Sequence, residues 1–283
     1  MAKHVIIGKG NLGIDISIAA KAMGNDARIF TSSDGFTLDS IPQIAALQPD
    51  YLWVTAGFGS IEQCKANPYK AFDTHLGLPI SVIQSMPECT RIGLFSTDYV
   101  ADPHDLDNPN KMVSDPRSLY ALSKASMERA VKMMNRPNVT VFRVSTLYGT
   151  HLPMKTLPGR LLTKFPSPCT IKLPQNHVTP TSTHWISEII LNSLPLLFSP
   201  VGPQFHNCAA STGTSVMNFG RRILGDQYTY ESKGMDWERP AYSNIDCSFT
   251  QAPTWEQMWE ATREAFLVSL RGPSCAVSGS PSP

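Results

Sequence analysis

His4-Val5-Ile6-Ile7-Gly8-Lys9-Gly10-Asn11-Leu12-Gly13 is the segment of this 283-residue chain that says most about its fold. The first four residues are a short apolar run, as expected of a parallel strand that is covered on both faces. The next six form a G-x-G-x-x-G pattern, and apolar residues then recur at helical spacing. Glycines allow a tight turn, and the N-terminus of a helix offers N–H groups to a phosphate. A strand, this pattern and a helix, in that order, predict a dinucleotide-binding unit rather than an ordinary turn.

The alternation of strand and helix continues through the first half of the chain. Short apolar runs predict further strands at residues 27–30, 51–55, 91–96 and 140–143. Helical patterns lie near residues 69–86 and 118–134, and Ser40-Ile41-Pro42-Gln43 has the spacing of a capping box at another helix start. This order predicts an α/β fold with a Rossmann-like doubly wound parallel sheet.

Beyond residue 150, frequent prolines divide the chain into short elements, which predicts a smaller C-terminal lobe. Helices are expected near residues 183–194 and after Thr254, where Thr254-Trp255-Glu256-Gln257 is a second capping-box pattern. We expect a nucleotide-binding domain over residues 1–150, completed by segments near 183–210, and a substrate-binding lobe over 151–270. Residues 271–283 are rich in Gly, Pro and Ser and are expected to form a disordered tail.

Composition narrows the class of protein and its location. Apolar residues make up 42% and charged residues 17%, which excludes a disordered chain and a coiled coil. Lys plus Arg number 24 against 23 Asp plus Glu, so no overall charge attracts nucleic acid or an anionic membrane. The six cysteines form no C-x-x-C pair, which is typical of free thiols in a reducing compartment. We expect a cytoplasmic protein without a metal site, and a homodimer is compatible with the sequence.

The residues after the second predicted strand bear on the choice of cofactor. An NAD site usually carries an acidic residue there to hold the ribose hydroxyls, whereas an NADP site avoids the repulsion between that acid and the 2′-phosphate. Here Thr31, Ser32 and Ser33 occupy the strand end, and Lys9 lies within the glycine loop. This pattern favours NADP over NAD.

Tyr120 and Lys124 are spaced to lie one turn apart on one face of a predicted helix. A lysine ammonium beside a phenol favours the phenolate and lowers the tyrosine pKa, so that the tyrosine can act as an acid near neutral pH. Thr97 follows the fourth strand, and side chains at the carboxyl ends of parallel strands reach the crevice where ligands bind. We expect the Thr97 hydroxyl to donate a hydrogen bond to a substrate carbonyl while Tyr120 protonates the same oxygen.

Together these residues resemble the extended short-chain dehydrogenase/reductase superfamily, and within it the dTDP-4-dehydrorhamnose reductase branch. Ser96-Thr97-Asp98-Tyr99-Val100 resembles the signature of that branch's fourth strand, and Tyr120 and Lys124 match its Y-x-x-x-K pair. Three further segments resemble motifs of the branch in the same order along the chain, at residues 142–149, 178–182 and 239–246. The resemblance covers nearly the whole chain and implies the fold described above.

The resemblance also implies roles for single residues. Thr97 would polarise the carbonyl, Tyr120 would donate the proton, and Lys124 would hold the nicotinamide ribose and tune Tyr120. Together with the glycine loop and the strand ends, it gives these cofactor contacts: Gly8, Lys9, Gly10, Asn11, Leu12, Ser32, Ala56, Gly57, Tyr120 and Lys124. The expected substrate contacts are Thr97, Asp98, Tyr99 and Thr146. The implied activity is the NADPH-dependent reduction of the 4-keto group of a nucleotide-activated deoxysugar, so the expected partner is a nucleotide-sugar substrate.

Four positions depart from the pattern of the branch. The glycine spacing is one residue shorter than the common G-x-x-G-x-x-G, and Thr55 and His75 stand where asparagine is common. Thr146 stands where the branch has a tryptophan that contacts the sugar, which leaves the identity of the sugar open. Two other functions also stay open: an NAD-dependent sugar-nucleotide epimerase or dehydratase, and a non-catalytic NADP-binding partner subunit of the same fold.

Overall fold

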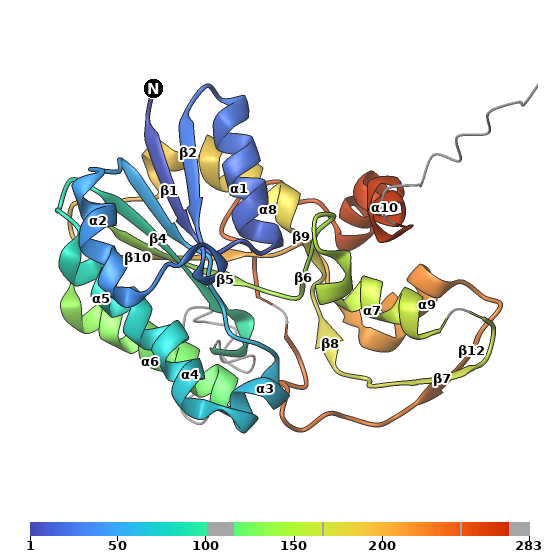
Figure 1. Ribbon diagram of the computed structural model, residues 1–283. Coiled ribbons are helices and arrows are strands. Elements are labelled where there is room, and N and C mark those ends of the chain that lie inside the picture. The colour runs from blue at the N-terminus through green and yellow to red at the C-terminus, as the bar shows by residue number, and fades with distance from the viewer. Residues whose placement is uncertain (101–115, 166, 244, 272–283) are drawn as a thin grey trace, which may run out of the picture.

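A six-stranded parallel sheet forms the centre of the protein (Figure 1). The computed structural model describes residues 1–100, 116–165, 167–243 and 245–271. The strands lie in the order β10 (Gln204–Cys208), β5 (Val139–Val144), β4 (Arg91–Thr97), β3 (Tyr51–Val54), β1 (Lys3–Ile7) and β2 (Asp26–Phe30). Every neighbouring pair in this sheet is parallel. The expected α/β fold with a Rossmann-like parallel sheet is confirmed.

Helices cover both faces of the sheet (Figure 1). One face carries α1 (Asn11–Ala22) and α8 (Thr183–Asn192); the other carries α2 (Ile41–Ala46), α5 (Leu78–Ser85) and α6 (Leu119–Met134). Successive strand residues point to opposite faces. In β1, therefore, Ile6 packs in the apolar cluster under α1 and α8, whereas Val5 and Ile7 pack in the cluster under the other three helices. This two-sided burial explains why the strands are continuous apolar runs.

The chain beyond β5 builds a smaller lobe beside the sheet (Figure 1). Its helices are α7 (Leu157–Lys164), α9 (Val216–Leu224) and α10 (Trp255–Arg271). Its short strands pair as β6 (Leu147–Tyr148) with β9 (Thr181–Ser182), β7 (Thr170–Leu173) with β12 (Thr229–Ser232), and β8 (His177–Val178) with β11 (Thr214–Ser215). Trp255, Trp259 and Phe266 of α10 pack with Phe219 of α9 and with Tyr148 in one apolar cluster. α8 and β10 leave this lobe and return to the sheet, and the tail expected over residues 271–283 lies outside the described residues after Arg271.

Two capping-box expectations have opposite outcomes. The box at Thr254 is confirmed, since Thr254 and Gln257 bond each other's backbone N–H groups at 2.9 and 3.2 Å. The box at Ser40 is wrong, because the Ser40 hydroxyl accepts the N–H of Thr37 in the preceding turn at 3.1 Å and makes no cap bond to α2.

The helix expected over residues 69–86 is interrupted at a position that matters for the site. It consists of α4 (Pro68–Phe72), a π-helical turn (Asp73–Gly77) and α5. A further helix that the sequence did not predict, α3 (Ile61–Ala66), precedes it and begins at a capping box. Single π-helical turns inside helices are frequent at functional sites.

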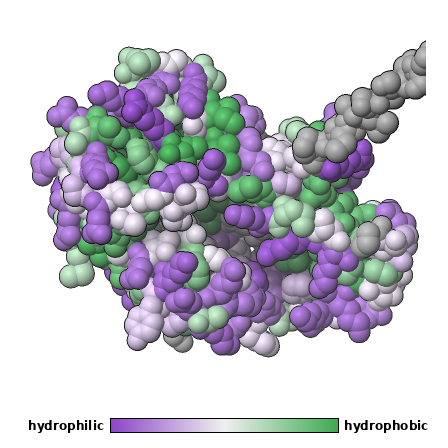
Figure 2. Space-filling view, in the orientation of Figure 1, coloured by the Kyte–Doolittle hydropathy of each residue, from purple (hydrophilic) through white to green (hydrophobic). Residues whose placement is uncertain are grey.

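Figure 2 shows that the surface is hollowed between the sheet and the smaller lobe, and that this face of the molecule is largely polar. Apolar side chains gather over α1 in the same view. Ile18 of α1 and Met23, directly after it, are about half exposed. Within the residues that the structure describes, no helix is both long and apolar enough to cross a membrane.

Candidate active site

The glycine loop between β1 and α1 has the shape that a bound phosphate requires. Gly8 has a φ of +118°, and a Cβ there would lie 2.6 Å from the backbone nitrogen of Ala56. A Cβ on Gly13 would lie 2.1 Å from the carbonyl oxygen of Gly8. A Cβ on Gly10, by contrast, would meet nothing within 4 Å, and this open space borders the N-terminus of α1. The three glycines thus provide the tight turn, the close helix packing and the open approach that the pattern predicts.

Thr55, directly after β3, holds the glycine loop in place. Its hydroxyl donates toward the carbonyl oxygens of Gly8 and Ile7, at 3.0 and 3.2 Å. The backbone N–H groups of Thr55 and Ala56 also bond the Ile7 carbonyl. Threonine can therefore occupy a position where asparagine is common, because a single hydroxyl donor is enough to bind this turn.

Two of the expected cofactor residues can reach a phosphate only through their backbone. The side-chain amide of Asn11 accepts the N–H of Leu152 at 2.7 Å and donates to its carbonyl at 3.2 Å. The side chain of Leu12 is buried in the apolar cluster under α1. The first turn of a helix leaves its N–H groups without partners inside the helix, so Asn11 and Leu12 still offer these donors.

The ends of β2 and β3 lie beside the loop. Ser32 is exposed after β2, and Lys9 and Gly57 are exposed as well, whereas Ala56 is partly buried. Asp34 is the first acid after β2, and its carboxylate accepts a hydrogen bond of 2.9 Å from the hydroxyl of Thr31. Thr31, directly after the strand, is buried, and the next residue, Ser32, is a serine that faces solvent.

α6 brings the expected proton donor to the end of β4. The hydroxyl of Ser118 accepts the N–H of Ala121 at 3.2 Å, and this cap places Tyr120 in the first turn of the helix. The Tyr120 hydroxyl lies close enough to the Thr97 side chain to have its pKa lowered by it. The Tyr120 ring stands edge-on to Tyr99, with 5.9 Å between centroids. The structure thus brings together the two side chains expected to act on one carbonyl oxygen.

The relation between Tyr120 and Lys124 differs from the expectation. Burial raises the pKa of Tyr120 above its usual value, and the hydrogen bond with Thr97 opposes this shift only in part. The Lys124 ammonium donates to the carbonyl oxygen of Phe95 at 2.7 Å, and burial lowers the pKa of Lys124 to about 8. The expected lowering of the Tyr120 pKa is therefore wrong for this structure, because loss of hydration disfavours a phenolate and the ammonium is turned to the backbone. The phenol of Tyr120 therefore holds its proton at neutral pH, as a weaker acid than a free tyrosine.

Asp98 does not face a substrate with its carboxylate. Oδ1 accepts the hydroxyl of Thr97 at 2.9 Å, and Oδ2 accepts the hydroxyls of Ser145, at 2.6 Å, and Ser243. The side chain is 4% exposed, and burial raises the pKa of Asp98 to about 7 against the smaller lowering by these hydrogen bonds. Asp98 thus joins the ends of β4 and β5 to a segment near the C-terminus instead of lining the site.

His75, on the π-helical turn, joins the loop after β3 to α6. Its Nε2 accepts the N–H of Phe58 at 2.9 Å, and its Nδ1 lies 2.8 Å from Ser123 Oγ, which assigns the ring proton to Nδ1. Burial lowers the pKa of His75 far below its usual range, so the ring is neutral. One ring nitrogen accepts and the other donates, which is the pairing that an asparagine amide also offers.

The segment over residues 236–243 crosses from the smaller lobe to the sheet. Arg239 donates to the hydroxyl of Tyr99 at 3.0 Å and to Asp236 at 2.9 Å. Glu238 pairs with Lys65 of α3 at 2.8 Å. Tyr99, an expected substrate contact, therefore has its hydroxyl engaged by Arg239. Thr146, the other expected contact in this region, is partly buried, and its carbonyl accepts the N–H of Thr181.

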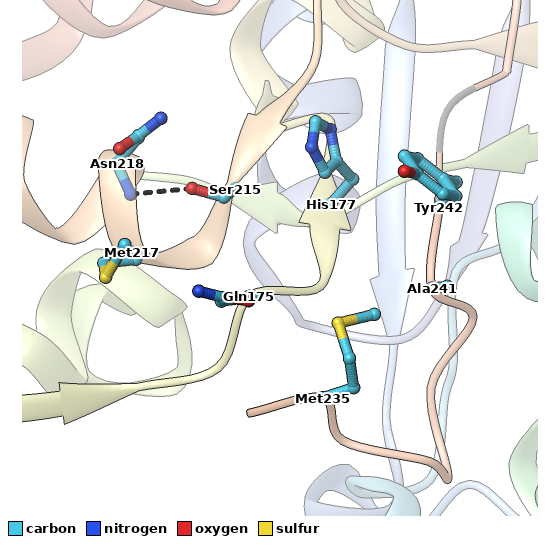
Figure 3. A pocket seen from close by; sticks show the side chains of 8 residues that line it. All are labelled: Gln175, His177, Ser215, Met217, Asn218, Met235, Ala241 and Tyr242. Carbon is cyan, nitrogen blue, oxygen red and sulfur yellow. Dashed lines mark hydrogen bonds between the residues drawn. The ribbon is translucent and has the colours of Figure 1, made fainter. Parts of the chain in front are cut away.

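A cavity of about 340 Å³ lies in the smaller lobe next to this segment (Figure 3). Its lining combines aromatic, thioether and amide side chains, including Gln175, His177, Met217, Asn218, Met235 and Tyr242. The rings of His177 and Tyr242 lie 5.0 Å apart. The lining includes no Lys, Arg, Asp or Glu, which suits a flat, uncharged ring system better than a phosphate.

The structure places the glycine loop, the ends of β2 and β3, Thr97 and Tyr120 at the carboxyl edge of one parallel sheet. Four residues that support this site have no role that the sequence alone predicts: His75, Ser145, Arg239 and Ser243. The last three lie in motifs that the sequence shares with the reductase branch, and this sharing was the only signal that could have pointed to them. The residue type alone does not show that Ser145 and Ser243 meet one carboxylate.

Comparison with protein families gives a match over nearly the whole chain. The family described as the RmlD substrate binding domain matches residues 5–270. No curated protein matches the sequence.

Solved structures that share the fold include reductases and an epimerase. The dTDP-4-dehydrorhamnose reductase of Clostridium acetobutylicum is 18% identical, with a TM-score of 0.80 over 94% of this chain and 99% of that one. The dTDP-4-dehydrorhamnose reductase of Bacillus anthracis, solved in complex with NADP, is 18% identical, with a TM-score of 0.79 over 95% and 99% of the two chains. The UDP-glucose 4-epimerase of Thermotoga maritima, solved with UDP-glucose, is 14% identical, with a TM-score of 0.76 over 94% and 99%. At these identities the likeness establishes the shared fold.

Proposed function

Because this chain belongs to the RmlD substrate binding domain family, we propose that it reduces the 4-keto group of a nucleotide-activated deoxysugar with NADPH. The observation that carries the proposal is the contact between Tyr120 and Thr97 at the carboxyl end of β4. A protonated phenol and a second hydroxyl converge there at the edge of the sheet that also carries the glycine loop. The reductases among the similar structures support this activity.

The cofactor would lie along this edge of the sheet. Backbone N–H groups at Gly10, Asn11 and Leu12 would face the pyrophosphate, and the open space at Gly10 leaves room for it. Lys9 and Ser32 would lie near the 2′-phosphate, Ala56 and Gly57 would line the adenosine side, and Lys124 would hold the nicotinamide ribose. When bound, NADPH supplies the hydride that reduces the carbonyl carbon.

Tyr120 would supply the proton of the same reduction. The carbonyl oxygen gains negative charge as its carbon is reduced, and the Tyr120 hydroxyl would give its proton to this oxygen, which leaves an alcohol and a phenolate. Lys124 would stabilise the phenolate once its ammonium meets the ribose and Tyr120 instead of the Phe95 carbonyl. The Thr97 hydroxyl would hydrogen-bond the same oxygen.

We place the nucleotide part of the substrate in the smaller lobe. The cavity beside residues 236–243 has an aromatic and thioether lining with amide groups, and that lining suits a base (Figure 3). Tyr99 and Thr146 would face the sugar between this cavity and Tyr120. Because Thr146 is smaller than the tryptophan of the branch, the sugar subsite would be wider than in those reductases.

A cytoplasmic location belongs to the same proposal. Cys64 and Cys208 are buried free thiols, and the remaining described cysteines are also free. Free thiols are the usual state of cysteine in a reducing compartment. We also propose a homodimer, which sedimentation of the purified protein would test.

Replacing Ser32 by Asp is expected to weaken NADPH binding by about 1–3 kcal/mol, which is about 5- to 150-fold in Kd. The reason is repulsion between the new carboxylate and the 2′-phosphate beside the end of β2. Fluorescence titration with NADPH and NADH measures the change, and Ser211→Asp, at an exposed serine of the smaller lobe, is the matched control. A wild-type protein that binds NADH as tightly as NADPH would contradict the assignment.

Replacing each of two loop glycines by alanine is expected to have different effects, one on stability and the other on NADPH binding. Gly13→Ala places a methyl group against the Gly8 carbonyl and should lower the free energy of unfolding by about 1–3 kcal/mol. Gly10→Ala points into open space, so it should leave the melting temperature of the free protein unchanged and weaken NADPH binding by about tenfold or more. Thermal melts with and without NADPH separate the two effects. Unchanged NADPH binding in Gly10→Ala would argue against a cofactor at this loop, and equal loss of stability in both variants would contradict the open space at Gly10.

The proposed activity is tested by identifying the nucleotide released from the purified, denatured protein and by assaying NADPH oxidation with a broad panel of nucleotide-linked 4-keto-deoxysugars. Turnover, with exchangeable NADP in the protein, is the expected result. Stoichiometric, tightly held NAD would favour an epimerase, which regenerates its cofactor within each cycle. Bound NADP without oxidation across the whole panel would favour the non-catalytic partner subunit.

A further inference from the structure

Asp98 and Thr97 compete for one hydrogen atom. The Thr97 hydroxyl has a single hydrogen, and it points to Asp98 Oδ1 at 2.9 Å. The oxygen of the same hydroxyl accepts the N–H of Tyr99 at 3.3 Å. While its hydrogen is held by Asp98, Thr97 can only accept hydrogen bonds and cannot stabilise negative charge on a substrate oxygen.

The two carboxyl oxygens of Asp98 have unequal surroundings. Oδ2 takes two donors, the hydroxyls of Ser145 and Ser243, whereas Oδ1 takes only Thr97. The Ser145 hydroxyl donates to Asp98 Oδ2, and its oxygen accepts the N–H of Thr179 at 3.3 Å. A proton on Oδ1 would therefore disturb nothing at Oδ2. It would reverse the hydrogen bond between the two residues: Oδ1 would donate to the Thr97 hydroxyl, and the Thr97 hydrogen would be free to point to the substrate.

We propose that Asp98 is a positioning residue that works in its protonated form: it donates to Thr97 and so directs the Thr97 hydroxyl to the carbonyl oxygen of the substrate. This inference rests on the proposed reductase function. Asp98 touches neither substrate nor cofactor and exchanges no proton with them. When Asp98 is deprotonated, the Thr97 hydroxyl donates its hydrogen bond to Asp98 again. The reacting oxygen then has one donor, Tyr120, instead of two.

The surroundings of Asp98 bring its pKa to neutral pH, so the protonated form is populated there. Its carboxyl group is buried, which costs the charged form its hydration and raises the pKa of Asp98 to about 7. In the part of the chain that the structure describes, the titratable side chains that face Asp98 are Tyr99 and Tyr120, and both are neutral at pH 7 because burial raises their pKa. The cations of this region are engaged elsewhere, Arg239 with Tyr99 and Asp236, and Lys124 with the Phe95 carbonyl. Among the described residues, Asp98 therefore has hydroxyl partners and no ion pair.

The pH dependence of kcat/KM should report the ionisation of Asp98. We expect kcat/KM to fall about tenfold for each pH unit above a midpoint near 7, and to approach a lower plateau where the remaining donor, Tyr120, acts alone. The loss caused by ionisation of Tyr120 itself would come at much higher pH, since its pKa is raised. Asp98→Asn is uncharged at every pH and should lose the fall whose midpoint lies near 7, leaving only the later fall that comes from Lys124, whose pKa burial lowers to about 8.

Ser243→Ala provides a test that does not depend on replacing the carboxyl group. This variant removes a hydroxyl that stabilises the ionised form, so the midpoint should move up by about one pH unit. Ser187→Ala is the matched control, because within the described part of the chain the hydroxyl of this buried serine on α8 bonds the carbonyl of His184 alone, and its loss should leave the midpoint in place. If Asp98 were merely structural, Ser243→Ala would lower kcat at all pH values and leave the midpoint where it is, and that result would overturn the inference.

A stability measurement decides the protonation state without any substrate. The folded protein holds the Asp98 proton up to about pH 7, whereas the unfolded chain releases it near pH 3.8. The stability that comes from this raised pKa is fully present below pH 3.8 and is lost as the pH rises to 7. Relative to Asp98→Asn, the melting temperature of the wild type should therefore fall by about 5 °C or more between pH 4.5 and 7.5.

The two kinds of failure are distinguishable. Absence of turnover at every pH would count against the reductase, while the melting curves would still report whether Asp98 holds a proton. Turnover with a flat pH profile, or a melting-temperature difference that does not change with pH, would overturn the role of Asp98 and leave the reductase intact. If Asp98→Asn does not fold, the midpoints of Ser243→Ala and Ser187→Ala decide the question.

Discussion

Tyr120→Phe is expected to lower kcat by about 10²- to 10⁴-fold, which is the usual effect of losing a general acid. Only the phenolic oxygen is removed, so the edge-on packing of the ring against Tyr99 and against His75 remains. Stability and NADPH affinity should therefore stay close to those of the wild type. The loss falls on kcat because the proton is needed when charge develops on the oxygen, and not when the substrate binds.

Steady-state assays with the best substrate of the keto-sugar panel, together with NADPH titration, measure this effect. Tyr69→Phe is a matched control, because it makes the same chemical change on a side chain that is 86% exposed. A Tyr120→Phe protein that keeps the wild-type kcat would show that another group donates the proton. A variant that loses NADPH binding together with kcat would instead indicate a structural defect.

Glu128→Leu is expected to lower the free energy of unfolding by about 3–5 kcal/mol, since it removes the carboxylate that pairs with the buried guanidinium of Arg143. Glu128 of α6 and Arg143 of β5 are both 0% exposed, and Nη2 of Arg143 lies 2.8 Å from Oε2 of Glu128. The Nε of Arg143 also donates to both carboxylate oxygens, at 3.0 and 3.2 Å. This ion pair joins α6 to β5 of the sheet. It therefore also helps to position Tyr120 and Lys124, which lie on α6, relative to β4.

Urea denaturation of the single and double variants measures the energy of this pair. Glu128→Leu combined with Arg143→Met should recover most of the loss, because two apolar side chains can replace a buried ion pair at little cost. Glu231→Ala breaks the exposed pair of Glu231 with Lys172 and should cost less than about 1 kcal/mol. If Glu128→Leu lowered the free energy of unfolding as little as Glu231→Ala does, the buried pair would not stabilise the fold as expected.

The departures from the branch pattern have different consequences. Thr55 and His75 keep the hydrogen bonds that their positions require, to the glycine loop and to the backbone of Phe58. Thr55 and His75 therefore hold the glycine loop and the loop after β3 in place, although neither is an asparagine. Thr146 is different, because a threonine cannot cover the area of a tryptophan, so we expect the difference in substrate preference to arise there.

The sequence by itself determined the architecture of the protein and which residues make up its candidate site. Apolar runs, helical spacing and the glycine pattern are local features, because each depends on neighbours within a few residues of the chain. They predicted the strands of the sheet before residue 150 and the helix that carries Tyr120 and Lys124. The meeting of Thr97 with Tyr120 could also be predicted, since the carboxyl ends of parallel strands share one edge of the sheet.

Only the tertiary structure decided how these groups are held and charged. Asp98 meets Ser145 across 47 positions of the chain and Ser243 across 145, and no local pattern encodes such a meeting. The direction of the Lys124 ammonium likewise depends on the exposed carbonyl at the end of β4. Protonation follows from the same packing: burial removes water from the phenol of Tyr120 and the carboxyl of Asp98, so both groups hold their protons more tightly than the residue types alone predict.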